Sequence, residues 1–153
     1  MMSHYLQQRY RGLYTLLPLF AVIIIIAACT SQPRHPAPAR NGENVVIEVN
    51  SLQPGTPKFF TYHYNNKYIS FFVLRLKSGI QSYLDACASC YTHKMGYRDE
   101  NGAVTCRFCN QRFSVSQLDK GLGGCYPIKI EGRIEKGQYL IPIAKLEAEA
   151  DKF

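Results

Sequence analysis

The sequence predicts a mostly β protein of the small α+β class, built from β-hairpins, a cysteine-rich region and a short C-terminal helix. Residues 45–84 hold short segments in which apolar residues alternate or cluster, with turn residues between them. Residues 87–125 hold five cysteines, four of them as two Cys-x-x-Cys pairs. The chain has neither strand–helix–strand alternation nor a glycine-rich phosphate loop, which argues against a nucleotide-binding α/β fold.

The first half of the folded part predicts a run of strands. Residues 45–50 alternate, with three branched apolar side chains on one face, as a half-buried strand does. Residues 58–64 and 68–76 are expected to form a hairpin around a tight turn at residues 65–67. A further strand is expected at residues 80–84, after a Ser-Gly turn.

The second half predicts shorter strands and a terminal helix. Residues 112–115, 126–130 and 139–143 combine β-branched and aromatic side chains and are expected to be strands. Pro142 suggests that the last of them lies at a sheet edge, because proline cannot donate to a ladder. Residues 144–152 read AKLEAEADK, a helical composition, and predict a short C-terminal helix.

Residues 1–29 predict a signal peptide with a lipobox. Arg9 and Arg11 precede an apolar run at residues 13–28, which ends in small residues before Cys29. The run is shorter than the roughly 20 apolar residues that a membrane-spanning helix needs. The residues IAAC, ending at Cys29, resemble a bacterial lipobox, so we expect lipidation at Cys29. The alternative is an uncleaved signal-anchor helix.

The lipobox and signal-anchor interpretations predict the same domain organisation. Residues 30–44 are rich in proline and polar residues and predict an extended tether. Residues 45–153 are expected to form a cysteine-rich metal-binding domain. With Arg9 and Arg11 inside, this domain lies on the extracytoplasmic side of the cell membrane, in the periplasm or at the cell surface.

Two Cys-x-x-Cys pairs predict a metal centre on Cys87, Cys90, Cys106 and Cys109. Fifteen residues separate the pairs, at the edge of the window typical of zinc sites. Each turn lets two thiolates converge on one ion, and residues 99–102 (DENG) supply a hairpin turn between the pairs. This knuckle region resembles a zinc ribbon, but four thiolates suit Zn²⁺ and iron–sulfur clusters alike.

Disulfide or redox chemistry is an alternative to metal binding by these cysteines. Local or crossed disulfides can form in an oxidising compartment, although the odd number of cysteines in the cluster at residues 87–125 argues against a plain disulfide framework. A thioredoxin-type redox pair needs a βαβ setting, which the sequence does not predict.

Three further residues are weaker candidates for the site. Cys125 follows a glycine-rich stretch that allows close approach of the backbone, so it is a less certain fifth ligand. It can instead replace one of the four, complete a second centre or remain a free thiol. His93 lies between the pairs, but a lone histidine is more often a surface or core residue, and His63 is weaker still. We identify no catalytic residues, because His, Ser and Asp form no recognisable hydrolase pattern.

Three runs of residues together resemble a known family. They are DACASCY (85–91), MGYRDENGAVTCRFCNQRF (95–113) and GGCYPIKI (123–130). In this order they are similar to the membrane iron–sulfur containing FtrD-like family, whose members show Asp-Ala-Cys-x-x-Cys, Gly-Tyr, Cys-x-x-Cys and Gly-Gly-Cys-Asn-Pro elements. The resemblance covers about residues 45–150, including the upstream hairpin. Tyr126 stands where the family usually has Asn, and Lys129 where it tends to be apolar.

The resemblance implies a cofactor and a role. It implies an iron–sulfur cluster on the five clustered cysteines, and a function in iron handling or electron transfer beside iron-transport or electron-transfer membrane proteins. Zn²⁺ is the alternative cofactor. The net charge of +7 is spread along the chain without a block of like charges, and this argues, with the export signal, against nucleic-acid binding.

Taken together, these features favour a lipid-anchored metal-centre protein, iron–sulfur in type, that serves iron uptake or electron transfer. We expect an electron-transfer or accessory role and not an enzyme. A structural zinc-ribbon lipoprotein that binds a partner is one alternative. A thiol–disulfide exchange protein is another.

Overall fold

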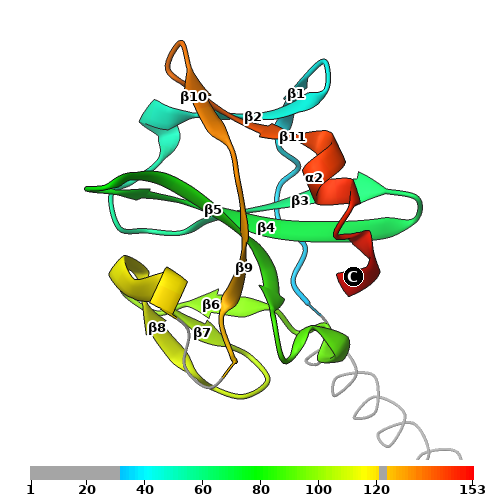
Figure 1. Cartoon of the computed structure of the whole chain (residues 1–153), viewed down its shortest axis with the longest axis vertical. Helices are drawn as coiled ribbons and strands as arrows, with labels where there is room; N and C mark the ends of the chain where they lie inside the picture. The colour runs from blue at the N-terminus through cyan, green and yellow to red at the C-terminus, as the bar shows by residue number, and fades with distance from the viewer. Residues whose placement is uncertain (1–31, 121–123) are drawn as a thin grey trace, which may run out of the picture. The chain divides into compact units, whose positions relative to one another are not determined.

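The described part of the chain, residues 32–120 and 124–153 of a computed structural model, folds into three antiparallel sheets, named A, B and C here (Figure 1). Sheet A has the order β1 (Ala39–Asn41), β2 (Asn44–Glu48), β11 (Gln138–Pro142), β10 (Arg133–Glu135). Sheet B has the order β3 (Lys58–Tyr64), β4 (Lys67–Leu76), β5 (Gly79–Cys87), β9 (Pro127–Ile130). Sheet C has the order β6 (Tyr97–Asp99), β7 (Ala103–Cys106), β8 (Arg112–Ser114). The predicted mostly β class is confirmed, but β11 lies between β2 and β10 and is not the edge strand that Pro142 suggested; Pro142 is its last residue.

The helical segments are short. The predicted C-terminal helix is confirmed as α2 (Ile143–Glu147), followed by the 3-10 turn η4 (Ala150–Lys152). Ile143 and Leu146 of α2 are buried and pack into the core beside sheet A. Further 3-10 turns in the described residues are η1 (Val49–Ser51), η2 (Tyr91–His93) and η3 (Val115–Lys120).

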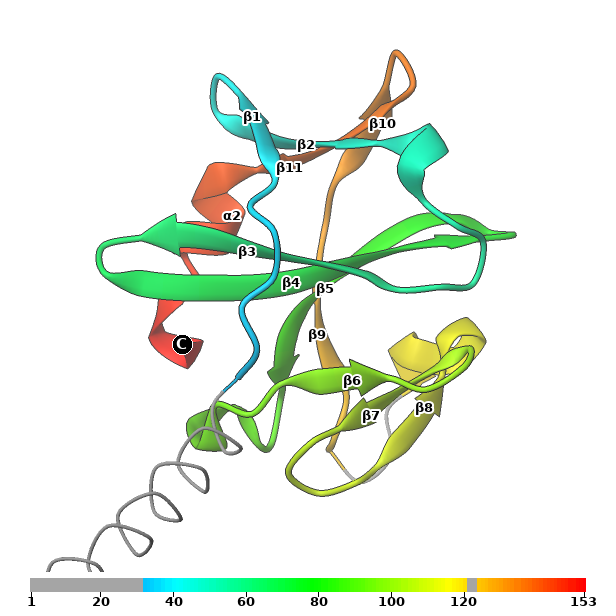
Figure 2. The ribbon, with the colours of Figure 1, turned by 180° about the vertical axis from the view of Figure 1, so that it is seen from behind.

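Sheet B lies between the other two sheets, as both views show (Figures 1 and 2). Phe71 and Val73 of β4 belong to a core shared with sheet A. Phe72 and Leu74 point to the opposite face and belong to a second core shared with sheet C. Because β4 is buried on both faces, its sequence is a near-continuous apolar run and does not alternate.

The hairpin β3–β4 confirms the predicted tight turn. Asn65 and Asn66 have φ of 44° and 60°, the left-handed pair that a two-residue hairpin turn needs and that asparagine tolerates. The turn pairs Tyr64 with Lys67 and sets the register that brings Phe60 opposite Phe71.

The segment expected to be an extended tether is in large part bound to the domain. Residues 32–38, named the N-terminal segment here, run beside β3, where the Thr61 amide donates to the Pro36 carbonyl at 3.2 Å. Residues 39–41 form β1, and β2 begins at Asn44. The compact unit therefore begins at Gln32 and not at Val45. Proline and polar composition indicated an extended chain, but not the contacts that hold it.

The predicted signal peptide, residues 1–29, and its Cys29 lie outside the described residues. Within the described residues, the structure has no helix with the length and apolar character to cross a membrane.

Candidate metal centre

The first cysteine pair lies where β5 leaves sheet B. Cys87 is the last residue of β5 and is buried, and the chain then turns so that the Cys90 amide donates to the Cys87 carbonyl at 3.1 Å. η2 follows directly, with the His93 amide bonded to the Cys90 carbonyl at 3.0 Å. This tight local geometry directs both thiols of the pair to one side.

The second pair lies between β7 and β8. Cys106 ends β7, and the Asn110 amide closes the turn on the Cys106 carbonyl at 3.0 Å. Asn110 has a φ of 58°, a left-handed conformation that asparagine tolerates. Cys106 is buried, whereas Cys109 is exposed.

Cys125 reaches the same place from the chain that leads into β9. Its sulfur lies 2.9 Å from the Cys87 sulfur and 3.3 Å from the Cys109 sulfur. Ser89 of the first turn donates to the Gly124 carbonyl at 2.6 Å, which fixes this chain beside the first pair. The three cysteine-bearing segments therefore meet although up to 38 residues separate them.

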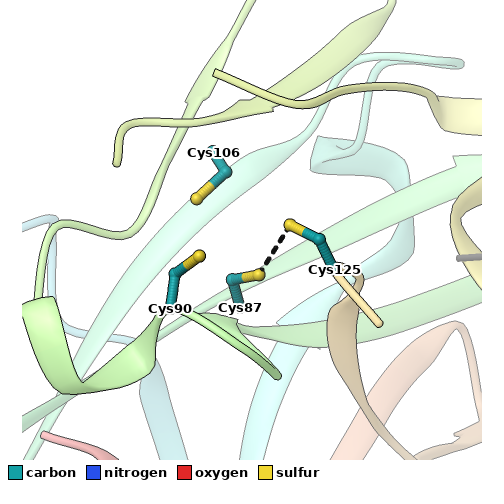
Figure 3. Close-up of side chains that lie close together, drawn as sticks. All are labelled: Cys87, Cys90, Cys106 and Cys125. Carbon is teal, nitrogen blue, oxygen red and sulfur yellow. Dashed lines mark hydrogen bonds between the residues drawn. The ribbon is translucent and has the colours of Figure 1, made fainter. Parts of the chain in front are cut away.

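The structure brings all five predicted thiols together, but it differs from the prediction in which of them lie at the centre of the group. The sulfurs of Cys87, Cys90, Cys106 and Cys125 all lie within 4.8 Å of one another and point toward a common centre (Figure 3). Cys125, the less certain candidate, is thus inside the four-sulfur group, and Cys109 lies at its exposed edge. Which of the five bind a metal stays a prediction.

Neither histidine belongs to the four-sulfur group of the described residues. The exposed His93 ring stacks on Phe108, with centroids 3.5 Å apart and an interplanar angle of 10°. His63 lies on β3, where its ring contacts Tyr68 at 5.0 Å. Both therefore have an aromatic partner, as the surface or core interpretation of a lone histidine expects.

The donor set fits a thiolate-bound metal of small size. All five thiols are free, and a cavity of about 10 Å³ is lined in part by Cys87, Cys90 and Cys106. Four sulfurs at about 2.3 Å from one tetrahedral ion lie ~3.8 Å apart, so the sulfurs of Cys87 and Cys125, now 2.9 Å apart, would separate slightly around such an ion. An iron–sulfur cluster would need the sulfurs to move further apart than a single ion does, because it is larger.

The thiols differ in how readily they ionise. Burial would raise the pKa of Cys87, but the Cys125 thiol, the nearby Tyr97 hydroxyl and the backbone amides of Ser89 and Cys90 together outweigh it and lower this pKa to about 7. Burial raises the pKa of Cys90 and Cys125, and the neighbouring thiols raise it further. Because ionising one thiol makes the next harder to ionise, a bound cation is the simplest way to stabilise several thiolates here.

A buried tyrosine contacts the centre from sheet C. Tyr97 begins β6 and pairs with Cys106 across the β6–β7 ladder. Burial, and then the nearby Cys87 thiol, raise the pKa of Tyr97. The hydroxyl therefore stays protonated, and it is a buried group without a hydrogen-bond partner among the described residues, near the Cys87 thiol.

Asp85 is a site residue that the sequence analysis missed. It is 1% exposed, and its carboxylate accepts the Tyr97 amide at 2.5 Å and the Gln32 side-chain amide at 2.9 Å. Burial raises its pKa to about 6, although these hydrogen bonds oppose the rise. Asp85 thus connects β5, β6 and the N-terminal segment around Cys87. An acidic residue inside an otherwise apolar strand end, YLDAC, was the available signal.

The cysteine-bearing loops carry positive charge. Residues 86–98 and 104–113 contain lysine and arginine but no aspartate or glutamate. Arg107 donates to the Tyr97 carbonyl at 3.0 Å, and Lys94 lines the same small cavity as three of the cysteines. These cations offset the negative charge that several thiolates bring to a metal.

Comparison with solved structures finds similar chains at low identity, among them a ferredoxin and a Rieske monooxygenase. The ferredoxin of carbazole 1,9a-dioxygenase from Nocardioides aromaticivorans IC177 has 16% identity and a TM-score of 0.42, covering 69% of this chain and 97% of its own. A putative nitrite reductase small subunit has 15% identity and a TM-score of 0.38, covering 63% and 93%. The quaternary ammonium Rieske monooxygenase CntA has 12% identity and a TM-score of 0.41, covering 72% and 32%. These TM-scores do not establish a shared fold.

Sequence comparison is more specific. No curated protein sequence matches the chain significantly. The family model described as membrane iron-sulfur containing protein FtrD-like matches residues 52–153, which hold all five clustered cysteines and most of the described domain. The chain therefore belongs to the FtrD-like family of membrane iron–sulfur containing proteins.

Proposed function

We propose that this protein is anchored at the extracytoplasmic face of a membrane and holds an iron–sulfur centre on its clustered cysteines, for iron uptake or electron transfer. The convergence of five thiols from three chain segments is the observation that carries the proposal. The name of the family supports iron–sulfur as the type of centre. The apolar run before Cys29 supports the anchor.

The residues of the chain have separate roles in this proposal. The thiols hold the centre, which supplies one-electron chemistry when it is bound. Asp85 fixes the Tyr97 amide, so a buried hydrogen bond holds the backbone beside Cys87 and Cys106 in place. The core shared by sheets B and C excludes water from one side, while Cys109 leaves the other side accessible.

A structural zinc module is the second candidate. The close spacing of the four sulfurs, all within 4.8 Å, favours a single ion over a larger cluster. In that case the metal stabilises sheet C and takes no part in electron transfer.

Anaerobic purification of the full chain in detergent, followed by iron, sulfide and zinc analysis and an absorption spectrum, separates these functions. Iron with a visible band that bleaches on reduction supports an electron-transfer centre, and release of iron on reduction supports iron handling. One zinc per chain without a visible band supports the second candidate. Metal-free, folded protein with its cysteines in disulfides would contradict both.

A matched pair of variants locates the centre. Cys106→Ser removes a buried thiol of the sulfur group and should abolish most metal binding. Ser114→Ala, in the same sheet but exposed, should leave the metal content unchanged. Full metal content in Cys106→Ser would exclude this site.

A further inference from the structure

The described part of the chain begins, at Gln32, beside the clustered cysteines. The Gln32 side-chain amide donates to the Asp85 carbonyl at 2.6 Å and to its carboxylate at 2.9 Å. Gln32 also lines the small cavity that Cys87, Cys90 and Cys106 line. The first described residue is therefore part of the surroundings of the candidate centre.

Further contacts hold the N-terminal segment to the domain. The His35 amide donates to the Thr61 hydroxyl at 2.9 Å, and the His35 ring stacks on Phe59 with centroids 4.9 Å apart. The Arg34 guanidinium lies 3.8 Å from the centre of the Tyr68 ring. These contacts leave residues 32–38 unable to act as a free spacer.

The chain available between anchor and domain is consequently very short. Two residues, Thr30 and Ser31, separate Cys29 from Gln32. Three residue steps span at most ~11 Å when fully extended. A lipid on Cys29 and an anchor helix that ends there both place the lipid surface at Cys29, so either anchor limits the distance in the same way.

The side chains around the entry point suit a lipid headgroup region. Lys94 and the 46% exposed Phe108 line the same cavity as Gln32, and Phe108 stacks on the exposed His93. The loops that carry these residues have no carboxylate. Exposed aromatic rings beside cationic side chains favour the interface of an anionic bilayer.

We infer that this end of the domain, the entry face (Gln32, His93, Lys94 and Phe108), rests on an anionic lipid surface and holds the metal centre next to the headgroups. The inference rests on the anchor of the proposed function. It implies that iron or electrons pass between the centre and a component within the membrane. β10 lies at the opposite end of the domain from sheet C and η2 (Figures 1 and 2), so in this orientation it points away from the lipid.

The chain offers a clean probe of this orientation because it contains no tryptophan. Phe108→Trp places an indole at the entry face, and Ile134→Trp places one on β10, where Ile134 is 60% exposed. The full-length variants are reconstituted in phosphatidylcholine–phosphatidylglycerol vesicles with and without headgroup nitroxide lipids. We expect the nitroxide to quench the indole fluorescence of the Phe108→Trp protein several-fold more than that of the Ile134→Trp protein.

The controls keep the outcomes separate. Quenching is expressed as a ratio at constant metal state, because a bound iron centre also quenches nearby indoles. His93→Trp is a second probe of the entry face, should Phe108→Trp disturb the second knuckle. Lys94→Glu in the Phe108→Trp protein should lower the quenching in anionic vesicles.

Two results overturn the inference: equal quenching in the entry-face and β10 variants, or no quenching in either entry-face variant. The second would leave this face to a protein partner. Metal content, measured on the same samples, tests the proposed centre separately. Metal-free protein with the expected quenching would contradict the centre and leave the orientation supported.

Discussion

Gly96 is fixed by the carboxylate that organises the site. Its φ is +67°, and a Cβ added there would lie 2.6 Å from an Asp85 carboxylate oxygen. The next residue, Tyr97, uses its amide to bind that same carboxylate. A glycine is therefore required both for the backbone conformation and for the space beside Asp85.

Gly96→Ala should destabilise the protein more than Gly102→Ala. Both positions have positive φ, so both alanines cost about 1–2 kcal/mol in backbone strain. Gly102 has open space around it, whereas the Gly96 methyl group would displace Asp85 and add roughly 1–3 kcal/mol. Urea unfolding of both variants measures the difference, and equal losses would mean that Asp85 yields without cost.

Cys125→Ser should weaken metal binding more than Cys109→Ser. Cys125 is 8% exposed and belongs to the four-sulfur group, while Cys109 is exposed at its edge. We expect a difference on the order of tenfold or more in retention against a chelator. The reverse order would show that the metal moves the sulfurs from their present arrangement.

The two cores differ in composition, so we expect the stability of the sheets to depend on a bound metal to different degrees. The buried residues of the core between sheets A and B are aromatic and aliphatic side chains, and one of them is an alanine. The core between sheets B and C includes Cys87, Cys106 and Cys125 among its buried members. Sheet C has only three short strands in the described residues, so it depends on this second core.

Removal of the metal should loosen sheet C and leave sheet A intact. Hydrogen exchange before and after chelation should show faster exchange in β6–β8, because the thiols then lose the cation that stabilises them. The amides of β2 and β11, which pair with each other, serve as the internal control. Uniform protection throughout would indicate that the metal contributes nothing to folding.

Sequence patterns identified elements where the local signal was strong. The β3–β4 hairpin followed from aromatic alternation and two asparagines, and β3 has the predicted bounds. β1 and β10 were missed because they are three exposed residues each, and their pairing to β2 and β11 defines them. Such strands leave no local pattern.

The candidate site likewise has features that a local pattern predicted and features that depend on contacts between distant segments. Spacing identified the two knuckles, since both thiols of each pair belong to one turn. The place of Cys125 inside the sulfur group depends on β9 pairing with β5, a contact between distant segments. The role of Asp85 depends on Gln32, 53 residues away, in a segment whose composition indicated a tether.

At the scale of the whole molecule, anchor and metal centre should be separable. Cys29→Ser removes the predicted lipid attachment and lies outside the described domain. We expect the variant to leave the membrane fraction while it keeps its metal, as fractionation and metal analysis would show. Retention in the membrane would favour the signal-anchor helix.

The N-terminal segment also covers part of the outer edge of β3, which is an edge strand of sheet B. In the proposed anchoring at Cys29, a protease that cuts between Cys29 and Gln32 would release the domain from the membrane. A cut beyond residue 38 would uncover the β3 edge, and such edges promote self-association. The same few residues thus determine whether shed protein stays dispersed or aggregates.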